Sequence, residues 1–166
     1  MLGRTIPEVT LKTRVRDESV GGPNPFRWQD VGTGELFAGK RMVVFSLPGA
    51  FTPTCSAQHL PGYVKLADQL KAKGVDEIWC ISVNDAFVMG AWGRDQKATG
   101  IVRMMADGSA AFTKALGLEF DLVAKGFGVR SQRYSMLVQD GVVKQLNVES
   151  GGFDVSSAET LLKQLG

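Results

Sequence analysis

The sequence has 166 residues, 44% of them hydrophobic and 22% charged, and a formal net charge of +2 at pH 7. That length predicts one domain over residues 1–166, and the dispersed charge argues against a nucleic-acid-binding surface. No apolar run reaches the ~18 residues that span a membrane, and the first residues lack a secretory signal. We therefore expect a cytoplasmic protein with no membrane partner, or a mitochondrial or other organellar one if a transit peptide has been removed.

The first half of the chain predicts strands and helices in alternation. Residues 9–15 suit a short strand, and residues 41–47 form a continuous apolar run typical of a strand buried on both faces. Residues 54–73 have helical spacing, with Thr54 as a possible cap and a kink expected at Pro61-Gly62. Residues 77–83 predict a second buried strand, followed by a helix over 84–97.

The second half begins with a strand over 102–106 and a helix over 109–116 that Gly117 closes. Residues 118–132 are predicted to be a long loop, and residues 133–148 a hairpin that turns at Asp140-Gly141. A final helix covers 156–165, with Ser156 and Glu159 as a possible capping box. This order predicts an α/β fold with a mixed central sheet, helices on both faces and an N-terminal strand extension, as in thioredoxin-like folds.

Cys55 follows a buried strand and is predicted to lie in the first turn of the next helix. Free N–H groups and the helix dipole stabilise an anion there, which favours a nucleophilic thiolate. Pro48 and Pro53 stiffen the preceding loop, and the Thr52 hydroxyl can donate to and accept from the two oxygens of a peroxide. The alternative is an ordinary strand-to-helix loop in which Cys55 is incidental.

The segment 48–55, PGAFTPTC, contains the pattern PxxxTxxC and is followed by His59-Leu60-Pro61-Gly62. It resembles the active-site signature of peroxiredoxins, in particular the type-five branch that includes the type II group of plants and bacteria. The resemblance continues through residues 82–88, 91–93 and 133–141, and so covers nearly the whole chain.

This resemblance implies a thiol-dependent peroxidase with an antioxidant role, acting on hydrogen peroxide and alkyl hydroperoxides. Cys55 would become a sulfenic acid, Thr52 would bind the peroxide and Pro48 would shield the thiolate. The family places an arginine beside the cysteine, just before the first hairpin strand. Arg133 occupies that position; Arg130 is the competing candidate, and a solvated surface arginine is the alternative for either.

His59 lies four residues after Cys55, on the same helical face, as an auxiliary residue. It is either a base for the thiol or a structural histidine bonded to a backbone carbonyl. Cys80 lies in a predicted buried strand, where it either resolves the sulfenic acid or only packs. Animal relatives use a cysteine near the C-terminus, and residues 154–158 contain none. We therefore expect a one-cysteine cycle, with glutathione, glutaredoxin or thioredoxin as the reductant.

We expect no cofactor and no metal, because two cysteines and one histidine do not make a zinc set. The sequence leaves three alternative functions: a Cys55–His59 hydrolase, a peroxide sensor that relays oxidation to a partner protein, and a disulfide reductase, which the missing CxxC disfavours. The family also suggests a homodimer built through loops around the site. Its interface candidates, which could equally be core residues, are Phe51, Phe87, Trp92 and Phe127.

Overall fold

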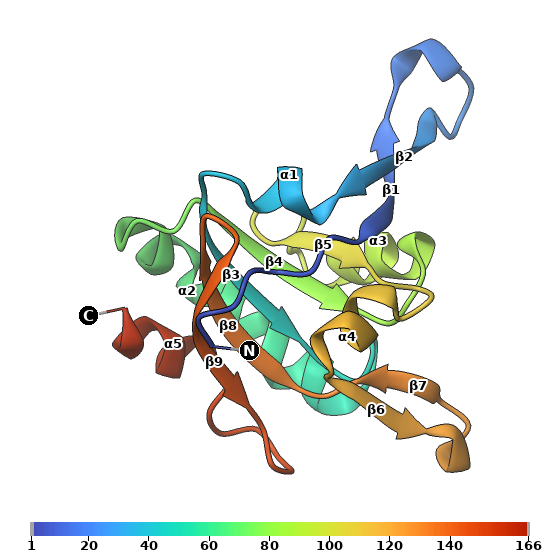
Figure 1. The fold of residues 1–166 in the computed structure, drawn as a ribbon. Helices are drawn as coiled ribbons and strands as arrows, with labels where there is room; N and C mark the ends of the chain where they lie inside the picture. The colour runs from blue at the N-terminus through green and yellow to red at the C-terminus, as the bar shows by residue number, and fades with distance from the viewer. Residues whose placement is uncertain (1, 166) are drawn as a thin grey trace.

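A five-stranded mixed sheet forms the centre of the computed structural model, which describes residues 2–165 (Figure 1). The strand order is β5-β4-β3-β8-β9. Strands β3 (Arg41–Ser46), β4 (Glu77–Ser82) and β5 (Arg103–Ala106) run parallel, whereas β8 (Tyr134–Gln139) and β9 (Val142–Val148) are antiparallel additions. The predicted mixed sheet is therefore confirmed.

Both faces of this sheet are buried, because alternate residues of each central strand enter different cores. Val43 and Phe45 of β3 pack on one side, and Met42 and Val44 on the other. The first side is covered by α2 (Leu60–Ala72), α3 (Ala86–Asp95) and α5 (Ala158–Gln164). The second side is covered by α1 (Thr33–Phe37) and α4 (Ala111–Leu116). Helices on both faces were predicted, and the structure confirms them.

The N-terminal extension is a two-stranded antiparallel arm that projects from the sheet (Figure 1). Its strands are β1 (Thr10–Arg16) and β2 (Phe26–Gly32), joined through a 3-10 turn, η1 (Glu18–Val20). Neither β2 nor α1 was predicted. The β2 side chains are exposed or half-buried. The strand therefore lacks the alternation of apolar and polar residues by which a strand is recognised in a sequence.

The predicted long loop over 118–132 is wrong. The segment forms a second small hairpin from β6 (Glu119–Leu122) and β7 (Gly128–Ser131), joined through η3 (Val123–Lys125) (Figure 1). The side chains of β6 are mostly exposed and those of β7 mostly half-buried, so neither strand shows the alternating apolar pattern that predicts a strand. The predicted turn between β8 and β9 is confirmed, since Asp140 and Gly141 both have positive φ, 48° and 77°.

Two predicted helix caps are also wrong. Thr54 has helical backbone angles and makes no side-chain cap, because the helix already begins at Pro53. In α5 the cap is Ser157, whose Oγ accepts from the N–H of Thr160, and not Ser156. The Ser156 hydroxyl donates instead to Glu149, so it is unavailable for a capping box.

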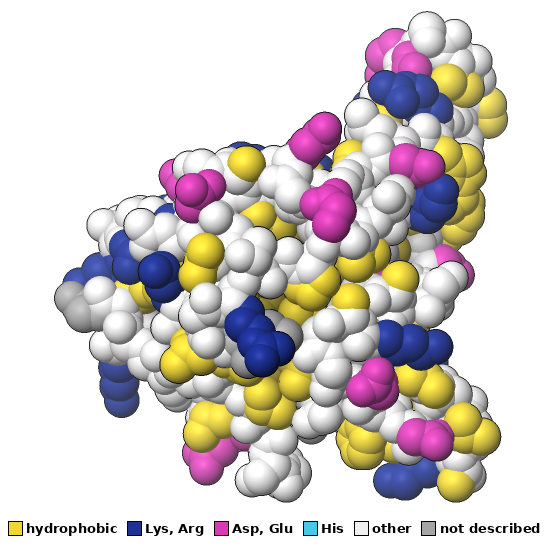
Figure 2. Space-filling model, viewed as in Figure 1, with side chains coloured by type: hydrophobic (Ala, Val, Ile, Leu, Met, Phe, Trp, Pro, Cys, Tyr) yellow, Lys and Arg dark blue, Asp and Glu magenta, His cyan; other side chains and the backbone are white. Residues whose placement is uncertain are grey.

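Charged groups are scattered over the face shown in Figure 2, and cations and anions are interspersed there. Hydrophobic side chains on this face include a group on the projecting β6–β7 hairpin. Among residues 2–165, no helix has both the length and the apolar character required to cross a membrane.

Candidate active site

Cys55 lies in the first turn of the helix that follows β3. The helix begins at Pro53, which has no N–H to leave unpaired, and the Thr52 carbonyl accepts from the N–H of Ser56 at 2.9 Å. The Cys55 side chain is fully buried. The sulfur thus lies at the start of a helix, where unpaired backbone N–H groups favour an anion, and has no exposed surface.

The turn from Cys55 to His59 is π-helical, η2, and the N–H of Leu60 donates to the Cys55 carbonyl five residues back. This wide turn comes immediately before Pro61, which cannot donate a helical hydrogen bond. The predicted helix irregularity therefore exists, but it lies at residues 55–59 and not at Pro61-Gly62. Helix α2 continues without interruption to Ala72.

The loop before Cys55 is held by a residue that the sequence did not single out, Asn84. Its Oδ1 accepts from the N–H of Ala50 at 3.0 Å and from the Ser82 hydroxyl at 2.7 Å. Phe51, the next residue of the loop, has a φ of 64°, which is strained for an aromatic side chain. Asn84 lies two residues after the end of β4, at the carboxyl edge where sites of parallel sheets gather.

A second anchor of this loop is Arg130 of β7. Its Nη1 donates to the Pro48 carbonyl at 3.1 Å and its Nε to the Phe127 carbonyl at 2.9 Å. A Cβ on Gly49 would lie 2.5 Å from the same Nη1, so only glycine admits the arginine here. The Thr52 hydroxyl donates to the Gly49 carbonyl at 2.7 Å.

Arg133, the residue directly before β8, is the arginine that lies beside the cysteine. Its Nη2 donates to Cys55 Sγ at 3.2 Å, and its Nη1 donates to His59 Nδ1 at 2.9 Å. One planar guanidinium thus holds the sulfur and the histidine together. Arg130, the competing candidate, contacts the loop and not the sulfur.

His59 is buried, and its bonding fixes its protonation. Its Nε2 lies 3.1 Å from the Ser156 carbonyl, which can only accept, so the Nε2–H form is present. Burial, and then the charge of Arg133, lower the pKa of His59 from 6.5 to about 3. His59 is therefore neutral, with its Nδ1 lone pair occupied by Arg133. The geometry favours the backbone-bonded histidine over a base for the thiol.

Cys80 lies in the middle of β4, in register with Phe45 and Met104 on the neighbouring strands. It is fully buried and belongs to the same core cluster as Cys55. Burial raises the pKa of the Cys80 thiol well above its usual range, so this side chain stays protonated.

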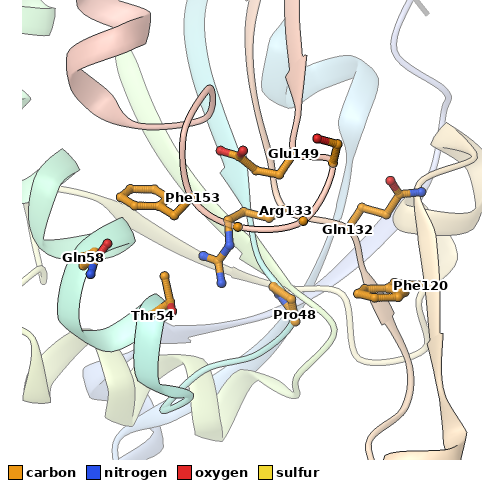
Figure 3. A pocket seen from close by; sticks show the side chains of 11 residues that line it. Pro48, Thr54, Gln58, Phe120, Gln132, Arg133, Glu149 and Phe153 are labelled. Atoms are coloured by element: carbon orange, nitrogen blue, oxygen red, sulfur yellow. The ribbon is translucent and has the colours of Figure 1, made fainter.

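A cavity of about 830 Å³ opens beside Arg133. Figure 3 shows the guanidinium pointing between Thr54 and Gln58 on the helix and Pro48 on the loop, with Phe153 close by. The remaining walls are Phe120, Gln132, Glu149, Ser150, Gly151 and Gly152. Arg133 borders both this cavity and the buried sulfur, and so connects them.

The structure divides the four aromatic interface candidates into one core residue and three exposed residues. Trp92 is fully buried, and its Nε1–H donates to Ser56 Oγ at 3.0 Å, so it belongs to the core and holds the helix turn that carries Cys55. Phe51, Phe87 and Phe127 are 52%, 56% and 42% exposed.

Sequence reasoning missed Asn84, Glu149 and Phe153 as parts of the site. Asn84 had a usable signal in its place directly after a buried strand. Glu149 and Phe153 had no such signal, because they flank the segment Ser150-Gly151-Gly152, whose path depends on tertiary contacts.

The fold and the site together define a thioredoxin-like protein built around one buried cysteine at a helix start. The Redoxin family model matches residues 3–162. A peroxiredoxin from Synechocystis is 48% identical over 173 residues, covering 99% of this chain and 91% of that protein. Peroxiredoxin-2B of Arabidopsis thaliana is 54% identical over 138 residues, which cover 82% of this chain and 85% of that protein. The structure of reduced Prx3 in complex with H2O2 from Vibrio vulnificus has a TM-score of 0.87 and 53% identity, and the match covers 100% of this chain and 99% of that chain.

The chain belongs to the peroxiredoxins, and within them to the type-five or plant type II kind. It is accordingly a thiol-dependent peroxidase, an oxidoreductase that reduces peroxide.

Proposed function

We propose that Cys55 is the residue that reduces the peroxide, and that hydrogen peroxide and alkyl hydroperoxides are both substrates. One observation carries this assignment: Arg133 donates to Cys55 Sγ at 3.2 Å while lining the cavity through which a substrate would approach. A fixed positive charge at that distance attracts an anionic sulfur. The cavity is much larger than hydrogen peroxide, which leaves room for an organic substituent.

In the reaction, the Cys55 thiolate attacks the terminal oxygen of the hydroperoxide. An S–O bond forms as the O–O bond breaks, so the sulfur is oxidised to a sulfenic acid and the substrate leaves as hydroxide or alkoxide. That anion takes a proton from water and departs as water or an alcohol. Arg133 stabilises the charge that develops on the leaving oxygen, as the donors of an oxyanion hole do.

Thr52 and Pro48 complete the proposed site. The Thr52 hydroxyl rests on the Gly49 carbonyl at 2.7 Å, and rotation about one bond would turn it toward a bound peroxide. Pro48 is a wall of the cavity and limits water access to the sulfur. His59 supports Arg133 and takes no proton, because it is neutral and its lone pair is already engaged.

We further propose that a separate thiol reduces the oxidised Cys55, namely glutathione, glutaredoxin or thioredoxin. The thiol displaces water from the sulfenic acid to give a mixed disulfide, and a second thiol then releases Cys55. Cys80 is a poor resolving residue, because it stays protonated and lies in the middle of a buried strand. With Cys80 so placed, the described residues support a one-cysteine cycle.

A homodimer is proposed through the exposed aromatic residues around the site. The Phe51 ring lies 6.3 Å from the ring of Trp92, and the Arg130 guanidinium lies over Phe127 while bonding Pro48. Burial of these rings against a second copy would remove exposed apolar area next to the substrate route. Sedimentation of Phe51→Asp and Phe87→Asp variants tests this: the variants should be monomeric under conditions where the wild type is dimeric.

The compartment remains a prediction. We expect a cytoplasmic protein, although one Arabidopsis relative, 49% identical over 167 residues, is named chloroplastic. Fractionation of the source cells followed by immunoblotting decides between these locations.

The reductant and the cycle are tested by mass spectrometry of peroxide-treated protein with glutathione, together with steady-state turnover. A mixed disulfide at Cys55 and sustained turnover support the proposal. A Cys55–Cys80 disulfide with no mixed disulfide would contradict the one-cysteine cycle. Oxidation of Cys55 without turnover with any of the three reductants would favour the peroxide sensor instead.

A further inference from the structure

We propose that Glu149 is a positioning residue that holds Arg133 against Cys55, acting through the loop of residues 149–157 and through His59. The inference rests on the proposed roles of Cys55 and Arg133. Glu149 lines the cavity, but its hydrogen bonds go to Asp154 and Ser156 of the loop, and its effect on Cys55 passes through three consecutive sets of hydrogen bonds.

The first set closes the loop. Glu149 follows the end of β9, and its Oε2 accepts from the N–H of Asp154 at 2.8 Å, the N–H of Ser156 at 2.8 Å and the Ser156 hydroxyl at 2.7 Å. Partial burial alone would raise the pKa of Glu149, but these hydrogen bonds outweigh it and lower the pKa. Figure 3 shows the carboxylate within the turn of the loop that carries Phe153. An ionised Glu149 therefore sets the path of the loop.

The second set fixes the direction of one carbonyl. With the Ser156 amide held by Glu149, its carbonyl points into the core. There it accepts from His59 Nε2 at 3.1 Å and from the Tyr63 hydroxyl at 2.8 Å. Two buried donors thus depend on a single loop carbonyl, and each would lose its partner if the loop moved.

The third set depends on the histidine tautomer. When Nε2 carries the proton, Nδ1 has a lone pair for Arg133 Nη1, 2.9 Å away. In the other tautomer Nδ1 would carry a proton facing the guanidinium N–H, and the two donors would repel. The Ser156 carbonyl therefore selects the only neutral form of His59 that keeps Arg133 in place.

Phe153 adds a contact from the same loop. Its ring centre lies 5.0 Å from that of His59, and the Arg133 guanidinium lies 5.9 Å from its centre. The loop thus holds both members of the Arg133–His59 pair, through its carbonyl on one side and its aromatic ring on the other.

The chain offers a clean reporter for this arrangement, since His59 is its single histidine. Nitrogen-15 NMR of histidine-labelled protein reads its tautomer directly. The groups that face it are Arg133, the Ser156 carbonyl, and the rings of Phe45, Tyr63 and Phe153. We expect the wild type to show the Nε2–H tautomer from pH 5 to 8, and a wild type with the Nδ1–H tautomer would overturn the inference without any variant.

The variants are Glu149→Ala and the near-isosteric Glu149→Gln, with Glu159→Gln as the control. Glu159 is an exposed carboxylate in the first turn of α5, so the control removes the same charge nearby. We expect the Glu149 variants to mix the two tautomers and to react with hydrogen peroxide about 10- to 100-fold more slowly, which corresponds to the loss of about one hydrogen bond to a charged group. The control should match the wild type in both measurements.

A double variant separates positioning from general stability. If Glu149 acts through Arg133, then Glu149→Ala should slow the reaction no further in an Arg133→Ala background. Additive losses there, or a folded Glu149→Gln with the wild-type tautomer and rate, would refute the inference. Failure of the proposed function would give a different result. The wild type would consume no peroxide, or a variant without Cys55 would still consume it, while the His59 tautomer would still change in the Glu149 variants.

Discussion

Replacement of Arg133 by lysine separates the charge of this residue from its geometry. Lysine keeps the positive charge, but its ammonium is a single point and cannot reproduce the two-pronged contact with Cys55 Sγ at 3.2 Å and His59 Nδ1 at 2.9 Å. One charge-assisted hydrogen bond, worth about 1.5–3 kcal/mol, is lost. Since every 1.4 kcal/mol is about tenfold in rate, Arg133→Lys should react with hydrogen peroxide about 10- to 100-fold more slowly.

Arg133→Ala removes the charge as well and should lose about 100- to 1,000-fold, the usual loss for a donor to a developing oxyanion. The matched control is Arg130→Lys, three residues earlier. The Arg130 guanidinium donates to the Pro48 and Phe127 carbonyls and lies over the Phe127 ring, so this variant should lose less than about fivefold. The assay is stopped-flow oxidation of pre-reduced protein, followed by fluorescence of the tryptophans, one of which, Trp92, bonds the residue beside Cys55. A lysine variant that reacts at the wild-type rate would refute this reasoning.

Three further outcomes are expected. Gly49→Ala should displace Arg130 from the loop and slow peroxide reduction by about fivefold. Thermal stability should be nearly unchanged, because the displaced atom is the end of a flexible side chain. Arg130→Ala should slow the reaction equally, and the double variant should be no slower than either single variant. Cys80→Ser should keep turnover with glutathione within about twofold, whereas loss of turnover would assign Cys80 a resolving role. His59 stays neutral in the folded protein, whereas in the unfolded chain it takes up a proton below its usual pKa of 6.5. Its contribution to the free energy of unfolding is therefore complete above pH 6.5 and is lost as the pH falls toward about 3. The free energy of unfolding in urea should therefore drop by about 2 kcal/mol between pH 7 and pH 5, and His59→Gln should lack most of that drop.

The central strands and the mixed sheet were predictable because these strands are buried on both faces. Segments such as residues 41–47 are continuous apolar runs, and the turn at Asp140-Gly141 has the residue types that positive φ requires. The arm strand β2 and the β6–β7 hairpin were not predictable in this way. Their side chains are almost all exposed or half-buried, so these strands show no alternation of buried and exposed residues that their sequence would reveal.

The site was predictable where the chemistry is local. The place of Cys55 at a helix start follows from the strand and prolines before it. The arginine beside it, 78 residues away, was expected only from the family resemblance, and its place at a strand end favoured Arg133 over Arg130. The partners of Arg133 were less accessible. Ser156 holds His59 from 97 residues away in the sequence, and a backbone carbonyl carries no residue-type signal.

The central claim is that Cys55 carries out the peroxide chemistry. Steady-state consumption of hydrogen peroxide, measured with glutathione, glutaredoxin and thioredoxin in turn, tests it most directly when the wild type, Cys55→Ser and Cys80→Ser are compared. The account predicts turnover by the wild type and by Cys80→Ser with at least one of the reductants, and none above background by Cys55→Ser. Wild-type turnover retained by Cys55→Ser would contradict it.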